Sequence, residues 1–211
     1  MRIKSIILLF VVSAISLSAQ NARSILDKAS DAYNKAGGLT ASFTLDSKDA
    51  KAKNTYSSDG KISMKGDKFK IETVDGITWF DGTTQWAYIK DTEEVNISNP
   101  TGEELQGISP SALFSIYKKG FRLNYKGEKR IAGKSILEVE MTPEKKNSDF
   151  SKITVQIDKA TNLFSSVTVN NKSGMQYTLN ISKMQTGVNL ADAVFSFNKR
   201  EYPKADIVDL R

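Results

Sequence analysis

The sequence contains no cysteine and no histidine among its 211 residues. Without cysteine there is no disulfide, no thiolate nucleophile and no Cys-rich zinc or iron–sulfur site. Without histidine there is no Ser–His–Asp triad, no imidazole base that titrates near neutral pH, and no ligand of the type that transition metals most often use. Only carboxylate, lysine, tyrosine or hydroxyl chemistry is left for an enzyme. The composition therefore favours a binding protein, and we expect no catalytic residue, no metal and no cofactor.

A long apolar stretch is also absent after the amino-terminal segment. Residues 1–19, MRIKSIILLFVVSAISLSA, combine a basic start, an apolar run from Ile6 to Val12 and small residues up to Ala19. This is the layout of a secretory signal peptide, and its apolar run is too short to span a membrane. The alternative is an uncleaved amino-terminal anchor. We predict cleavage and export, which leaves residues 20–211 as a mature protein outside the cytoplasm.

Charge of one sign is not in large excess. The chain carries 30 Lys plus Arg against 24 Asp plus Glu, and two of the basic residues, Arg2 and Lys4, fall within residues 1–19. The lysines are scattered along the chain rather than clustered, as on an ordinary solvated surface. An excess of this size and distribution is weak support for nucleic-acid binding, so we expect no nucleic-acid partner.

One amphipathic helix is predicted over residues 22–36. Apolar side chains, among them Leu26 and Tyr33, recur there at spacings of three and four, and charged residues take the opposite face. Asn21 is placed to cap the start of this helix, and Gly37 is placed to end it.

After this helix the apolar period changes to two. Turn pairs such as Asp59-Gly60 and Asp81-Gly82 separate the alternating runs. Many short alternating strands predict one antiparallel sheet with one apolar face, strongly curved or nearly closed. The predicted class is α+β, mainly β, with a single domain over residues 20–211 and a polar connection from Asp46 to Asp59. The clearest runs are Phe43–Leu45, Ile62–Met64, Phe69–Thr73, Trp86–Tyr88, Phe121–Tyr125, Leu137–Met141, Ile153–Ile157, Val167–Val169 and Met175–Ile181.

A second short helix is predicted over residues 109–119, SPSALFSIYKK, where Ser109 can cap and Pro110 suits the first helical position. Together with the first helix it is the only cover that the sequence offers for the apolar face of the sheet. Two thin helices over so broad a face leave a cavity, or the face is filled by an ordinary packed core. The pattern alone leaves both open. Residues after Phe197 are predicted as loop, with a final strand as the alternative.

Several segments together resemble the LolA-type outer-membrane lipoprotein carriers. The most specific is FDGTTQWAY at residues 80–88, which is similar to the Asp-Gly…Trp-x-Tyr hairpin of that family. The likeness covers most of residues 22–200, in the order of the family. Its other parts are the helix ILDKASDAY, the strand entry LTASFT at Leu39–Thr44, the strands Gly60–Lys65 and Asp67–Ile71, and AVFSF at Ala193–Phe197, which is similar to the closing strand.

This resemblance implies an incomplete, half-open barrel around a helical lid, with an apolar cavity for the acyl chains of a lipoprotein. It implies a monomeric periplasmic chaperone that carries acylated lipoproteins from an inner-membrane releasing complex to an outer-membrane acceptor. Where the family has an Arg that helps to hold the lid closed, this chain has Lys65, which keeps the charge and loses the rigid donor fork. The residues then expected to line the cavity are Phe43, Ile62, Met64, Phe69, Ile71, Trp86, Tyr88, Leu113, Phe114, Phe121 and Met141.

Two other functions remain open at this point. Related half-barrels serve as envelope-stress sensors, so a regulatory module that binds a lipid or a misfolded protein is the first alternative. The second is a hydrolase, because Glu138 and Glu140 lie two apart on one strand and so share one face, as paired catalytic carboxylates do. Since Leu137, Val139 and Met141 take the apolar face of that strand, we expect the two carboxylates to be solvated and not catalytic.

Overall fold

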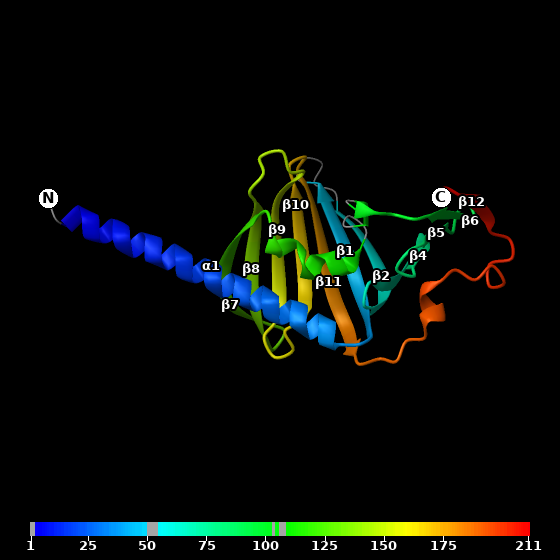
Figure 1. Ribbon diagram of the computed structural model, residues 1–211, viewed down its shortest axis with the longest axis horizontal. Coiled ribbons are helices and arrows are strands. Elements are labelled where there is room, and N and C mark those ends of the chain that lie inside the picture. Colours follow the sequence, from blue (N-terminus) through cyan, green and yellow to red (C-terminus); the bar gives the residue numbers. More distant parts are fainter. Residues whose placement is uncertain (1–2, 50–54, 103, 106–108) are drawn as a thin grey trace. The chain divides into compact units, whose positions relative to one another are not determined.

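The computed structural model describes residues 3–49, 55–102, 104–105 and 109–211, with side chains from residue 18 onward (Figure 1). The helical elements include α1 (Ile3–Lys35) and the 3-10 helices η1 (Pro110–Phe114), η2 (Ile116–Lys118) and η3 (Asp192–Phe195). The strands are β1 (Leu39–Asp49), β2 (Thr55–Lys65), β3 (Lys68–Thr73), β4 (Gly76–Phe80), β5 (Gln85–Ile89), β6 (Glu94–Ser98), β7 (Phe121–Ile131), β8 (Lys134–Pro143), β9 (Phe150–Asp158), β10 (Phe164–Asn171), β11 (Met175–Thr186) and β12 (Asp206–Asp209).

In the described ranges, twelve strands form one open, unclosed sheet in the order β12-β6-β5-β4-β3-β2-β1-β11-β10-β9-β8-β7. Consecutive strands from β2 to β6 and from β7 to β10 pair antiparallel, whereas β12 pairs parallel with β6. The predicted class, α+β and mainly β with an open sheet, is confirmed. The turns follow from local chemistry: between β7 and β8, Ala132 and Gly133 both have positive φ, as a two-residue hairpin turn requires.

Contacts divide the chain into two compact units, which are described separately below. The first unit comprises Met1–Tyr33, Ser47–Asn54 and Phe114–Thr178, and the second comprises Asn34–Asp46, Thr55–Leu113 and Leu179–Arg211. The prediction of a single domain over residues 20–211 stays a prediction.

In the first unit, α1 lies across the strands β7 to β10 (Figure 1). The register places Val139, Val155 and Val167 side by side on three neighbouring strands, so their side chains point to one face. All three are buried, as are Leu26 and Tyr33 on the packed side of α1. Burial of apolar area between the helix and this face is the main source of stability in the unit.

In the second unit, the register separates the large side chains of β2 to β5 into two opposite faces. Ile62 pairs with Ile71, and Met64 pairs with Phe69, which in turn pairs with Phe80. We call the side of the sheet that carries these five side chains the Phe69 face. On the opposite side, the Trp86 face, the register aligns Ile77, Trp79, Trp86, Tyr88, Val95 and Ile97.

Three local predictions are wrong. The first helix does not begin at a cap on Asn21, because α1 runs without a break from Ile3 to Lys35. The predicted connection from Asp46 to Asp59 belongs largely to β1 and β2, since polar side chains pair across it: Ser57 Oγ donates to Asp46 at 2.7 Å. Its central residues, 50–54, lie outside the described residues.

The third wrong prediction is the closing strand at Ala193–Phe197. The chain there forms η3, where the Val194 N–H donates to the Ala191 carbonyl at 3.0 Å and Phe195 is fully buried. The last strand is instead β12, which agrees with the alternative prediction of a final strand after Phe197. The predicted helix at residues 109–119 is present as the two short turns η1 and η2.

Candidate functional site

The side chain of Phe114 lies between two other aromatic rings of the first unit. Its ring stacks on Tyr33 of α1, with centroids 4.2 Å apart, and on Phe164 of β10, with centroids 4.5 Å apart. Tyr33 and Phe164 are buried, whereas Phe114 is half-buried and η1 contains no buried residue. Phe114 therefore fills the space between helix and sheet from a surface turn. We call this arrangement the ring stack.

Tyr117 fixes the next turn, η2, to α1. Its hydroxyl donates to Asp27 Oδ1 at 2.6 Å, and the residue is 1% exposed. Burial raises the pKa of Tyr117, and the hydrogen bond to Asp27 raises it further, so the phenol stays protonated and remains a donor at neutral pH. Tyr117, which follows the turn that carries Phe114, thus holds η2 on α1 through this hydrogen bond.

The other expected cavity residues of the first unit are Phe121 and Met141. Met141 is 1% exposed and lies in register between Leu123 and Ile153 on the apolar face under α1. Phe121 is half-buried at the start of β7. Tyr33 and Phe164 were not among the expected site residues, although Tyr33 belongs to the apolar stripe of the helix; Phe164 lies just before the alternating run that marked its strand.

In the second unit, Ile62, Met64, Phe69 and Ile71 share the Phe69 face, as expected for residues of one surface. Phe43 reaches the same face, because its ring covers Gly60, whose register position lies on that side of β2. The Phe69 and Phe80 rings lie 5.3 Å apart, and both are 1% exposed. Leu113 is half-buried in η1.

Trp86 and Tyr88 do not join that group, because they lie on the opposite side of β5. There the half-buried Trp86 and Tyr88 pack against a buried cluster that includes Val95 and Ile97. The carboxy-terminal segment covers this face: Trp79 lies 5.7 Å from Phe197 and 5.6 Å from Tyr202 between ring centroids, in edge-on contacts. Trp86 and Tyr88 therefore do not share a surface with Ile62, Met64, Phe69 and Ile71, and the role of the eleven residues as a cavity lining stays a prediction.

Lys65 contacts the segment that leads into η3. Its Nζ donates to the Leu190 carbonyl at 3.0 Å and to Asp192 Oδ1 at 2.9 Å, and Lys68 Nζ lies 2.8 Å from Asp192 Oδ2. Lys65 and Lys68 thus both form ion pairs with the carboxylate of Asp192, an arrangement that we call the Asp192 clamp. That Lys65 also holds a helical lid closed stays a prediction.

The Asp192 carboxylate is expected to titrate far below a normal aspartate. The hydrogen bonds from Lys68 and Lys65 lower its pKa from 3.8 to about 2. Because the folded pKa is lower than the unfolded one, the stabilisation is complete above about pH 4 and is lost as the pH falls towards 2. NMR titration of the carboxyl carbon should give a midpoint near 2, and one near 4 would show that the clamp is absent in solution.

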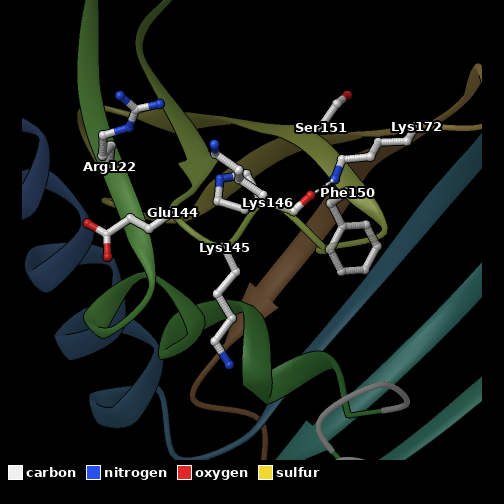
Figure 2. Close-up of a pocket in the computed structure, with 8 residues that line it drawn as sticks. Arg122, Glu144, Lys145, Lys146, Phe150, Ser151 and Lys172 are labelled. Carbon is white, nitrogen blue, oxygen red and sulfur yellow. Dashed lines mark hydrogen bonds between the residues drawn. The ribbon is translucent and has the colours of Figure 1, made fainter.

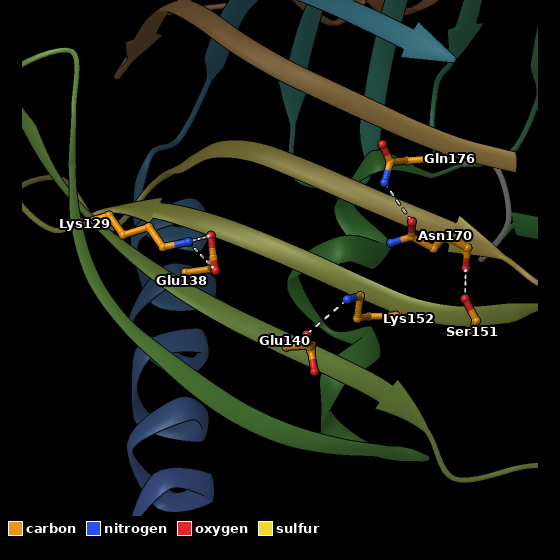
Figure 3. A network of polar contacts seen from close by, with 7 residues as sticks. All are labelled: Lys129, Glu138, Glu140, Ser151, Lys152, Asn170 and Gln176. Atoms are coloured by element: carbon orange, nitrogen blue, oxygen red, sulfur yellow. Dashed lines mark hydrogen bonds and ion pairs between the residues drawn. The ribbon is translucent and has the colours of Figure 1, made fainter. Parts of the chain in front are cut away.

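Glu138 and Glu140 take part in a polar network on the other face of the first unit (Figure 3). Lys129 Nζ donates to both Glu138 oxygens, at 2.8 and 2.9 Å, and Lys152 Nζ lies 3.3 Å from Glu140 Oε2. The side chain of Glu138 is only 13% exposed, so the expectation that both carboxylates are solvated is wrong for Glu138. The hydrogen bond from Lys129 lowers the pKa of Glu138, which makes it a weak base and no proton donor at neutral pH.

No three acidic side chains gather into a metal-binding group in the part of the chain that the structure describes. Over the same residues, none of the helices has both the length and the apolarity to cross a bilayer.

Comparison with known proteins gives a family and a fold. No curated protein matches the sequence. Among solved structures, an uncharacterized conserved protein from Thermus thermophilus matches with a TM-score of 0.62 at 15% identity, over 90% of this chain and 99% of that one. The Mycobacterium tuberculosis lipoprotein LppX matches with a TM-score of 0.51 at 16% identity, over 82% of this chain and 100% of that one.

A LolA superfamily protein from Nitrosomonas europaea matches with a TM-score of 0.44 at 12% identity, over 83% of this chain and 97% of that one. The sequence profile of the family described as outer membrane lipoprotein carrier protein LolA matches residues 12–174, most of the chain. The chain therefore belongs to the family of the outer membrane lipoprotein carrier protein LolA.

Proposed function

We propose that this protein is a periplasmic carrier that shields the acyl chains of lipoproteins between the inner and the outer membrane. Membership of the carrier family supports the proposal, and so does the ring stack, in which a surface turn fills apolar space between α1 and the sheet. The cargo would be received from an inner-membrane releasing complex and passed to an outer-membrane acceptor. The carrier would act as a monomer and would need no cofactor.

The energies of the ring stack suit reversible capture. An acyl chain of roughly fifteen carbons in water costs on the order of 12 kcal/mol, at about 0.8 kcal/mol for each methylene. Opening the ring stack breaks two aromatic pairs, each contributing about 0.5–1.5 kcal/mol, and exposes one Phe side chain at about 1.5–3 kcal/mol. The cargo therefore supplies more than enough free energy to displace Phe114, and the ring returns when the cargo leaves.

The same geometry says why Phe114 has to move. Its ring lies 4.2 Å from Tyr33 and 4.5 Å from Phe164, so no acyl chain fits between these residues while the ring is in place. Tyr117 anchors the following turn, so the movement would be confined to η1. Met141, a flexible side chain on the face beneath α1, suits a lining that adapts to different chains.

Export of this carrier fits the packing of α1. Among the residues whose side chains are described, the buried residues of α1 are Ala22, Leu26, Ala29, Ser30 and Tyr33, all of which follow Ala19. Cleavage after residue 19 would therefore keep these buried apolar contacts, and it would remove the hydrogen bonds from Ser18 Oγ to Asn124 Oδ1 and to the Tyr125 carbonyl of β7.

The test replaces the ring contact between η1 and α1 by a covalent link. Because the chain has no natural cysteine, the double variant Tyr33→Cys/Phe114→Cys can be joined by a short bismaleimide without side reactions. The joined protein should lose binding of a fluorescent long-chain fatty acid and of a synthetic diacylated lipopeptide by tenfold or more, whereas the unjoined double variant should bind both. Protein from the periplasmic fraction is used, so its mass also reports cleavage after residue 19.

The matched controls are the two single-cysteine variants treated with the same reagent, which should bind like the untreated protein. Equal binding by the joined and unjoined double variants would show that η1 does not have to move for an acyl chain to enter. Failure of every form to bind either probe would overturn the carrier proposal itself.

A further inference from the structure

One end of the first unit carries a pocket of about 760 Å³ whose lining is basic. It lies where the start of β7, the β8–β9 connection and the β10–β11 turn come together, and Figure 2 shows its lining side chains. Four cationic side chains and a single carboxylate line it, with one aromatic ring. The lining residues are Arg122, Pro143, Glu144, Lys145, Lys146, Phe150, Ser151 and Lys172. We call it the basic pocket.

Among the residues that the structure describes, the cations of the basic pocket form no ion pair, whereas several other lysines of the unit do. Lys129, Lys152 and Lys159 each form an ion pair with a glutamate. Within the described residues, Arg122, Lys145 and Lys146 form no ion pair and are exposed, and Lys172 Nζ is directed to the Lys146 carbonyl oxygen. The lining therefore carries four cations against the single carboxylate of Glu144, an excess of positive charge.

The surroundings of this charge suit an anionic lipid surface. Phe150, at the start of β9, is 39% exposed in the same lining, so an apolar ring stands among the ammonium groups. Basic side chains beside an exposed aromatic ring are the usual composition of a surface that lies in the headgroup region of a membrane. Three separate backbone segments supply the charges, which spreads them over an area rather than along one strand.

The basic pocket is unsuited to holding acyl chains itself. Its charged lining would have to be desolvated around an apolar chain, which is unfavourable. None of its lining residues belongs to the ring stack of Tyr33, Phe114 and Phe164. The residues proposed to capture acyl chains thus differ from the basic-pocket residues that can contact phosphate groups.

We propose that the basic pocket docks this protein on anionic phospholipid membranes, with Arg122, Lys145, Lys146 and Lys172 contacting lipid phosphates and Phe150 entering the headgroup layer. This goes beyond the carrier proposal, because it assigns a direct membrane contact to the protein without its cargo. Each lysine near an anionic surface adds roughly a factor of five to the partition coefficient at low salt.

The test measures sedimentation of the cargo-free protein with vesicles of phosphatidylethanolamine and phosphatidylglycerol, and with vesicles of phosphatidylcholine alone. The protein should bind only the anionic vesicles, and binding should fall as salt shortens the Debye length. Lys145→Gln/Lys146→Gln should lower the partition coefficient roughly thirtyfold. Phe150→Ala should lower it by a smaller factor that does not depend on salt.

The matched control is Arg200→Gln/Lys204→Gln, which removes the same charge from two exposed residues of the second unit. This control should bind anionic vesicles like the unaltered protein. If both double variants lose vesicle binding equally, net charge alone explains the loss, and the assignment of the basic pocket as the docking site is overturned. Absence of any binding to anionic vesicles would overturn it as well, while fatty-acid binding in the same samples would leave the carrier proposal standing.

Discussion

Phe69→Ala is expected to lower the free energy of unfolding by about 3–5 kcal/mol, as removal of a packed core ring does. Phe69 is 1% exposed, its ring lies 5.3 Å from that of Phe80, and it faces Met64 in register on β2. The resemblance to the carrier family implies that this residue lines a cavity for acyl chains. Urea unfolding followed by circular dichroism measures the loss, and lipid binding of the same variant is measured below its transition.

The control for this substitution is Phe150→Ala, which removes the same ring from a side chain that is 39% exposed. A loss below about 1 kcal/mol is expected there. If Phe69→Ala also loses less than about 1 kcal/mol and binds less fatty acid, the ring faces a hollow that cargo fills. The loss of unfolding free energy and the change in fatty-acid binding together show whether Phe69 is a core residue or a cargo contact.

Gly60→Ala is expected to destabilise the protein by about 1–3 kcal/mol through overpacking. A Cβ at this position would lie 2.2 Å from Cζ of Phe43 and 2.7 Å from the backbone oxygen of Glu72. The ring would have to leave its place over β2, and the backbone of β3 would have to shift. Thermal unfolding measures the effect as a lower Tm.

Two further variants make this second result specific. Gly133→Asn changes a glycine that has open space around it and a φ of +80°, which asparagine tolerates, so its Tm should change little. Adding Phe43→Leu to Gly60→Ala should recover part of the lost stability, because the shorter side chain relieves the contact. Strict additivity of the two substitutions would show that Phe43 is not the obstacle.

The alternating pattern predicted most of the sheet because one buried face imposes a period of two on each strand. It did not predict β4, where the adjacent Trp79 and Phe80 are both buried and point to opposite faces, or β6, where only Val95 and Ile97 alternate. The strand at Asp206–Asp209, expected only as an alternative to loop, pairs parallel with β6, a partner more than a hundred residues away, and such pairing leaves no turn signal beside the strand. The resemblance to the carrier family supplied the open architecture.

The candidate site could be predicted less well, because alternation fixes faces only within a strand. Whether Trp86 shares a face with Met64 depends on the register across every intervening turn. In the structure this register places Trp86 on the opposite side of the sheet from Met64. The carboxy-terminal rings Phe197 and Tyr202 that cover Trp79 carry no periodic signal. The resemblance places Phe114 among the cavity residues, but its partner Phe164 lies outside the alternating run.

The place of β1 in the sheet has a kinetic consequence. It borders β2 on one side and β11 on the other, and the hydrogen bond from Ser182 Oγ to the Ser42 carbonyl joins residues 140 positions apart. Loop closure over such separations slows folding, so maturation should take milliseconds to seconds or longer. Until β11 has been synthesised and delivered, one edge of β1 stays open to other chains, and overproduction should fill inclusion bodies unless a holdase covers that edge.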